Sequence, residues 1–131
     1  MRLAPAIGLG SALGGSCRYL LDELSLMIGS SSFPLATFMV NVSGSLLIGW
    51  LTGRWALGGS LRISQEKWHF WMTGFCGGYT TFSTFSFQVL QMLQDGEGQA
   101  AGVYAAGSVG FGLLAVWLGM SIAARRNLEA S

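Results

Sequence analysis

The chain has 131 residues, of which 51% are hydrophobic and only 10% are charged, and its formal net charge is +1. Soluble domains carry about 25% charged residues, so this composition and a mean hydropathy of +0.51 exclude an ordinary soluble domain and indicate a membrane protein. The near-neutral charge excludes the basic surface that nucleic-acid binding needs. His69 is the only histidine and there is no Cys-x-x-Cys pair, so no zinc-binding pattern is present.

Four apolar blocks follow one another along the chain. A membrane-spanning helix needs about 20 predominantly apolar residues, and segments of at least that length lie at residues 3–28, 34–57, 65–94 and 98–124, separated by short polar joints. We therefore predict an all-α membrane protein whose residues 1–126 form a single domain of four transmembrane helices. Residues 127–131 are set aside as a tail of the kind that expression vectors add.

The first block contains a cationic residue within its apolar run. Arg18 interrupts its apolar run, and Asp22 and Glu23 follow closely. A guanidinium inside a membrane segment usually faces a partner or a water-filled cavity. A long Arg side chain also reaches the interface from the end of a shorter helix, and the nearby carboxylates fit that alternative. The residues alone leave both interpretations of Arg18 open.

The second block contains one amide. Asn41 lies within the run TFMVNVSGS at residues 37–45. An amide in the middle of a membrane helix commonly forms a hydrogen bond to another helix. Helix packing and the lining of a pore are therefore equally compatible with Asn41.

The third block contains the most informative run, GFCGGYTTFSTFS at residues 74–86. Three glycines followed by alternating hydroxyl residues and phenylalanines do not favour a regular, uninterrupted α-helix. Because a lipid-embedded segment must satisfy its backbone polar groups internally, a helix break here indicates a buried polar or ion pathway. Phe82 and Phe85 are three residues apart and share a helix face. The hydroxyls of Ser83 and Thr84 line a path or simply bond to carbonyls one turn back.

The fourth block contains two polar residues on one helix face, Tyr104 and Ser108, which are four residues apart. Glycines stripe this block and the first two, where they are expected to let helices approach closely. Four spans place both termini on one side of the membrane, and the positive-inside rule makes that side cytoplasmic. The cations expected there are Arg2, Arg54, Arg62, Lys67, Arg125 and Arg126.

No catalytic site is expected. A hydrolase needs a nucleophile beside an oriented base, and the charge-free cores of the blocks contain no Asp or Glu. A coupled exporter of the small-multidrug type needs a membrane carboxylate and is disfavoured for the same reason. A structural membrane protein, in which glycines and hydroxyls only pack helices, is the other alternative to a channel.

Three motifs together resemble the Fluc/CrcB family of fluoride channels. They are GGSCRY at residues 14–19, TFMVNVSGS at 37–45 and, most specifically, GFCGGYTTFSTFS at 74–86. The resemblance covers most of the chain. It implies passive, fluoride-selective export across the bacterial inner membrane by an antiparallel, dual-topology homodimer with two pores. It also implies that the third helix is broken near its middle.

The resemblance further implies roles for individual residues. Backbone carbonyls of Gly77 and Thr80 from both subunits would hold a central structural sodium ion. Arg18 would lie in a vestibule. Fluoride would meet the positive edges of aromatic rings, while hydroxyls and an amide replace its lost water. The expected pore residues are Phe82, Phe85, Asn41, Ser83, Thr84, Tyr104 and Ser108.

Two features depart from the family pattern. The family usually has Glu where this chain has Gln88, which removes a charge but keeps the capacity for hydrogen bonds. The one-sided distribution of cations is also unusual for a dual-topology subunit, and it fits one half of an oppositely oriented hetero-pair. The homodimer is favoured because this single chain contains all the pore motifs.

Overall fold

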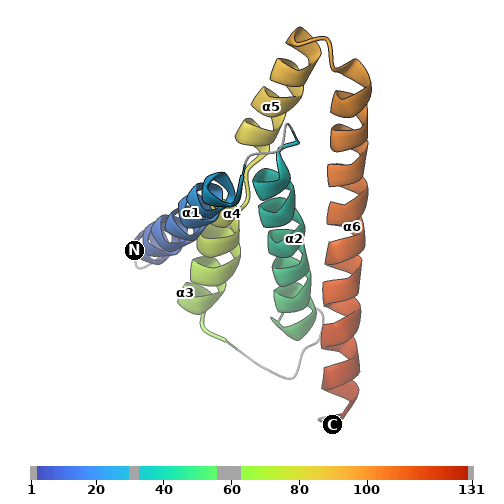
Figure 1. Cartoon of the computed structure of the whole chain (residues 1–131). Helices are drawn as coiled ribbons and strands as arrows, with labels where there is room; N and C mark the ends of the chain where they lie inside the picture. Colours follow the sequence, from blue (N-terminus) through green and yellow to red (C-terminus); the bar gives the residue numbers. More distant parts are fainter. Residues whose placement is uncertain (1–2, 30–32, 56–62, 130–131) are drawn as a thin grey trace.

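A computed structural model describes residues 3–29, 33–55 and 63–129, and these residues form helices and short joints without a strand. Three helices are long, and the segment between the second and third of them consists of shorter helical pieces (Figure 1). In chain order the elements are α1 (Leu3–Ile28), α2 (Leu35–Trp55), α3 (Gln65–Trp68), the π-helix η1 (His69–Cys76), α4 (Gly77–Tyr79), α5 (Phe82–Gln94) and α6 (Gly98–Glu129).

The observed helices follow the predicted blocks, with differences at the ends. α1 has the bounds of the first block, and α6 continues past residue 124 to Glu129. Residues 56–57 of the second block lie outside the described part of the chain. Among the described residues, α2 and the Gly98–Arg126 part of α6 are long and apolar enough to cross a membrane. The prediction of an all-α protein with membrane-compatible helices is therefore confirmed.

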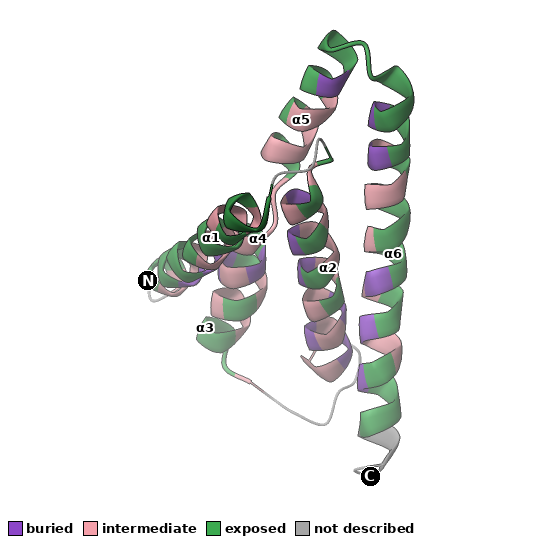
Figure 2. Ribbon diagram, in the orientation of Figure 1, coloured by how far each residue is buried: buried purple, intermediate pink, exposed green. Residues whose placement is uncertain are grey.

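Exposed residues run along every long helix of the single chain (Figure 2), and many of them are large hydrophobic residues. Phe82 is 80% exposed, whereas Tyr104 and Val40 are each only 1% exposed. A small cluster of Met92, Ala101 and Tyr104 joins α5 to α6. Soluble monomers rarely leave such large apolar areas uncovered, so this surface is suited to contact with lipid or another protein chain.

α2 and α6 lie side by side (Figure 1) and approach closely at glycines. A Cβ atom added to Gly49 would collide with the carbonyl of Val116, and one added to Gly119 would collide with the carbonyl of Leu46. The predicted packing role is thus confirmed for these two glycines. By contrast, a Cβ at Gly102 would meet nothing within 4 Å in the single chain.

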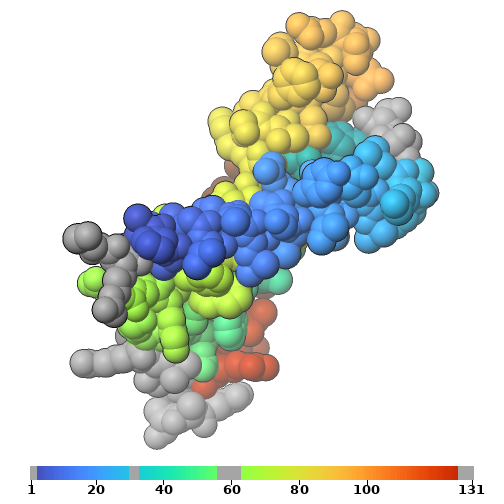
Figure 3. Space-filling view, turned by 90° about the vertical axis from the view of Figure 1, so that its left-hand side faces the viewer, coloured from blue at the N-terminus to red at the C-terminus, as the bar shows by residue number. Residues whose placement is uncertain are grey.

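α1 lies across the segment formed by η1 and α4, as Figure 3 shows. Glycines again set the distance: a Cβ at Gly10 would collide with the carbonyl of Phe70, and one at Gly78 with the carbonyl of Ser11. The Ser11 hydroxyl donates to the carbonyl of Gly74 at 3.4 Å. Close backbone contact therefore fixes the part of the chain that precedes the helix interruption.

The helical segment from Gln65 stops at Tyr79 and resumes at Phe82. Between them, Thr80 (φ −82°, ψ 161°) and Thr81 (φ −149°, ψ 123°) have extended backbone. Thr81 caps the new helix, because its hydroxyl oxygen accepts a hydrogen bond from the backbone N–H of Thr84 at 3.1 Å. The two threonines therefore separate α4 from α5 and give α5 a proper start.

Candidate functional site

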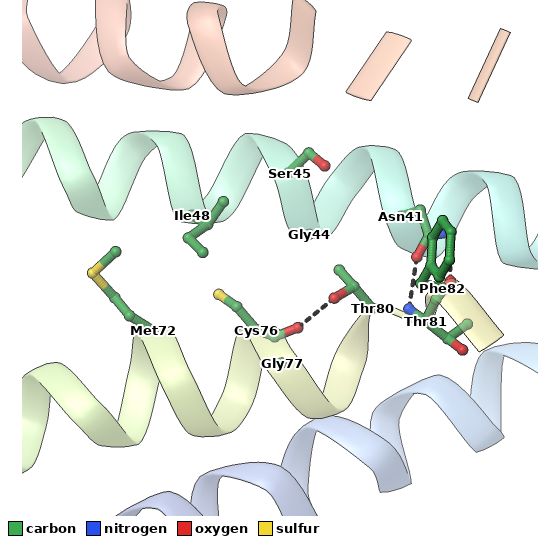
Figure 4. A pocket seen from close by; sticks show the side chains of 10 residues that line it. All are labelled: Asn41, Gly44, Ser45, Ile48, Met72, Cys76, Gly77, Thr80, Thr81 and Phe82. Atoms are coloured by element: carbon green, nitrogen blue, oxygen red, sulfur yellow. Dashed lines mark hydrogen bonds between the residues drawn. The ribbon is translucent and has the colours of Figure 1, made fainter. Parts of the chain in front are cut away.

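The helix interruption is held by one side chain from α2 (Figure 4). The Asn41 amide nitrogen donates to the carbonyl of Thr81 at 3.0 Å, and the Thr81 N–H donates to the Asn41 amide oxygen at 2.8 Å. These bonds satisfy two backbone groups that the interruption removes from regular helical pairing. The predicted cross-helix hydrogen bond of Asn41 is therefore present, and its partner is the backbone at the break.

A cavity of about 320 Å³ lies beside this contact, between α2 and the interrupted segment (Figure 4). A Cβ at Gly44 would collide with the Thr80 methyl group, so glycine is needed there for close approach. At Gly77 an added Cβ would meet nothing within 4 Å, so this wall is open. The structure thus brings Gly77 and Thr80, the predicted sodium ligands, to one cavity together with Asn41.

The two phenylalanines of the third block begin α5. Their ring centroids are 5.8 Å apart with an interplanar angle of 42°. Phe85 is half-buried and also contacts the ring of Tyr104 at 5.3 Å. The predicted shared face of Phe82 and Phe85 is confirmed, and Phe82 presents its exposed ring at the edge of the cavity.

A chain of three polar side chains connects α6, α5 and α2. The Tyr104 hydroxyl donates to the Gln88 amide oxygen at 2.9 Å, and the Gln88 amide nitrogen donates to the Thr37 hydroxyl oxygen at 3.0 Å. The amide fixes the direction of both bonds, since its oxygen only accepts and its nitrogen only donates. The Tyr104 proton is consequently engaged, whereas the Thr37 proton is left to donate elsewhere.

The remaining predicted hydroxyls fall into two groups. Thr84 and Ser83 surround the cap, with their hydroxyl oxygens 3.1 and 3.3 Å from that of Thr81. Ser108 differs, because its hydroxyl oxygen is buried and has no hydrogen-bond partner among the described residues. A buried unpaired hydroxyl is costly, so Ser108 is a candidate to bind something that the single chain does not supply.

Comparison with known proteins identifies the family. The family model described as "CrcB-like protein, Camphor Resistance (CrcB)" matches residues 5–120. The chain belongs to the CrcB family. The resemblance drawn from the three motifs is thereby confirmed.

Several relatives share this membership and have curated names. The chain is 45% identical over 113 residues to the fluoride-specific ion channel FluC of Paramagnetospirillum magneticum, covering 86% of this chain and 88% of the relative. It is 43% identical over 121 residues to FluC 1 of Rhodopseudomonas palustris, covering 92% and 86%. It is also 43% identical over 121 residues to FluC of Methylocella silvestris, covering 92% of each chain. Each of these relatives carries the name of an ion channel.

Arg18 lies apart from the other candidate residues of this CrcB protein. It is half-buried on α1, and its Nε atom is buried without a hydrogen-bond partner among the described residues. It does not line the cavity beside Gly77.

Sequence reasoning did not select Thr37, Thr81 or Gln88 as site residues. In the structure Thr81 bonds to Asn41 and Gln88 bonds to Tyr104, both of which were selected, and Thr37 bonds to Gln88. Thr81 was detectable, because a threonine directly before an apolar helical run is a helix-capping signal. Thr37 and Gln88 are 51 positions apart, and no local sequence pattern predicts their contact.

Proposed function

We propose that this CrcB protein is a fluoride-selective channel that lets fluoride leave the bacterial cytoplasm passively across the inner membrane. The observation that carries the proposal is the interrupted segment: Asn41 holds Thr81 beside the Phe82 and Phe85 pair. The relatives match this chain over most of their own length, and their names support fluoride as the ion.

Hydrogen-bond donors and aromatic ring edges near the helix interruption would offset the free-energy cost of removing water from fluoride. The second N–H of Gln88 and the Ser108 hydroxyl retain protons that the described contacts do not use. The rings of Phe82 and Phe85 have positive edges that suit a small anion. The Ser83 and Thr84 hydroxyls and the Asn41 amide add donors nearby. Several weak sites in a row allow an ion both to enter and to leave.

Residues 65–94 would form a single interrupted membrane crossing, giving four crossings with α1, α2 and α6. Non-helical backbone within a membrane is tolerated where protein covers it or where it lines a cavity. The Asn41 bonds to Thr81 and the cavity next to them supply these conditions. The outer faces of the helices would contact lipid.

An antiparallel homodimer would complete two pores. Phe82 is 80% exposed in one chain, which supports a pore wall that a second chain completes. The exposed apolar surface supports such an assembly, since uncovered patches of this size mark interfaces. Arg18 would then lie in a vestibule at a pore entrance.

The carbonyls of Gly77 and Thr80 from both chains would hold a structural sodium ion at the dimer centre. Backbone oxygens are ligands suited to hard cations, and both residues line the cavity, Gly77 on an open wall. When bound, the ion would supply positive charge near the anion path.

Ion flux in proteoliposomes tests the proposal. Vesicles loaded with fluoride and carrying the purified protein should release it when valinomycin and a potassium gradient set the membrane potential, and chloride-loaded vesicles should not. Protein-free vesicles give the background rate. Fluoride release at the background rate, or equal release of fluoride and chloride, would contradict the proposed function.

A further inference from the structure

A second hollow lies on the other side of the interrupted segment, between the start of α1 and the elements α3 and η1. It is an open groove of about 420 Å³. Its apolar and charged walls come from Ala6, Leu9, Glu66, Lys67, Phe70 and Trp71. None of these six lines the cavity beside Gly77, where η1 contributes Met72 and Cys76 instead. The groove is therefore a hollow separate from the proposed sodium site.

The groove runs from charged to apolar residues. Glu66 and Lys67 are the last Asp, Glu, Lys or Arg residues before the charge-free run 68–94. Phe70 and Trp71 follow them by about one helical turn. Tryptophans concentrate at the level of lipid head groups, which fits Trp71 and its neighbour Trp68. The groove therefore extends from head-group depth toward the hydrocarbon.

The apolar part has the features of a wall for an acyl chain. Leu9 is 67% exposed and Trp71 is 38% exposed. Trp71 is held between two other rings, with centroid distances of 5.2 Å to Phe70 and 5.3 Å to Phe75. A rigid aromatic surface opposite an exposed leucine offers apolar contact without loss of side-chain freedom on binding.

The charged end of the groove, formed by Glu66 and Lys67, would favour some phospholipid head groups over others. One cation and one anion lie at the same end, and among the described residues neither side chain forms an ion pair. A head group with a phosphate and a primary ammonium complements both, since Lys67 attracts the phosphate and Glu66 accepts N–H bonds from the ammonium. A purely anionic head group would face repulsion from Glu66, and a trimethylammonium group has no N–H to donate. We propose that this groove binds a phospholipid with a zwitterionic primary-amine head group.

Native mass spectrometry of the purified full-length protein tests the proposal. It is mixed with equal amounts of phosphatidylethanolamine, phosphatidylcholine and phosphatidylglycerol that have the same acyl chains. Phosphatidylethanolamine should be retained in preference to both others. Glu66→Gln and Lys67→Gln should each lower its retention about two- to fivefold, the range expected of exposed charge pairs, whereas Glu97→Gln at the other end of the molecule should not.

Leu9→Trp gives an independent test, because the larger side chain fills the groove while Glu66 and Lys67 keep their charges. Leu9 is exposed, so its position tolerates a larger side chain. It should lower retention of all three lipids. Equal retention of the three lipids by the unmodified protein, a preference for phosphatidylglycerol, or unchanged retention in all three groove variants would overturn the proposal. Fluoride flux measured on the same samples separates this site from the channel function, since neither result depends on the other.

Discussion

Asn41 matters at the scale of single residues because one side chain satisfies both backbone groups of Thr81. Its amide presents a donor and an acceptor side by side, which no aliphatic or hydroxyl side chain of similar size reproduces. The sequence predicted a cross-helix bond for this amide but not its partner, which lies 40 positions away. For Gln88 the sequence indicated only a capacity for hydrogen bonds, since its bonds to Thr37 and Tyr104 arise only once three helices have packed.

Replacing Asn41 with Ala should destabilise the fold. The Thr81 N–H and C=O would lose their partners in a half-buried position, and each unsatisfied buried group costs about 1–3 kcal/mol. We expect a loss of about 2–4 kcal/mol, measured from denaturant unfolding in detergent micelles. Ser45→Ala is the matched control, because Ser45 lines the same cavity from the same helix. An Asn41→Ala variant as stable as Ser45→Ala would show that the two bonds contribute nothing.

At the scale of elements, glycine contacts and the two threonines position the site. α1 is seated against η1 and α4 through backbone contact, and α2 reaches the break through Asn41. The composition of residues 74–86 was sufficient to predict an interruption of the helix. The extended backbone of Thr80 and Thr81 lies within that run. The π-helix His69–Cys76, a form that is rare in proteins, was not predicted from the sequence.

Gly74→Ala should move α1 away from the interrupted segment. The added Cβ would lie 2.7 Å from the carbonyl oxygen of Ile7 and 3.0 Å from the Cα of Gly10, both backbone atoms that cannot turn aside. We expect a cost of about 1–3 kcal/mol in unfolding free energy, as for other overpacked sites. Gly102→Ala, where the Cβ meets nothing within 4 Å, should be neutral. Equal stability of the two variants would argue against close packing at Gly74.

At the scale of the whole molecule, charge and apolar exposure bear on the proposed assembly of two chains. The end of α2, the start of α3 and the end of α6 lie at one end of the molecule, opposite the joint between α5 and α6 (Figure 1). Arg54, Lys67 and Arg126 belong to that end, whereas Asp95 and Glu97 belong to the joint. Segments and charge bias could be predicted from the sequence, but the proposed pairing of two chains would depend on surfaces formed only after folding.

Removal of sodium tests the proposed centre of the dimer. If the Gly77 and Thr80 carbonyls of two chains hold this ion, exhaustive exchange of sodium for N-methylglucamine should lower the dimer fraction or the fluoride flux. Adding sodium back should restore both. Gel filtration in detergent and vesicle efflux provide the two measurements. Dimer fraction and flux that are unchanged after exchange would exclude sodium as a structural component.

The most direct measurement of the central claim is fluoride efflux through a protein that lacks the paired rings at the helix break. Phe82→Ile together with Phe85→Ile keeps apolar bulk but removes the positive ring edges, so fluoride release should fall to the protein-free background. Phe87→Ile, at a 59% exposed position on the same helix, should release fluoride like the unmodified protein. Full efflux through the doubly substituted protein, with its fold intact by circular dichroism, would contradict the assignment of the anion path.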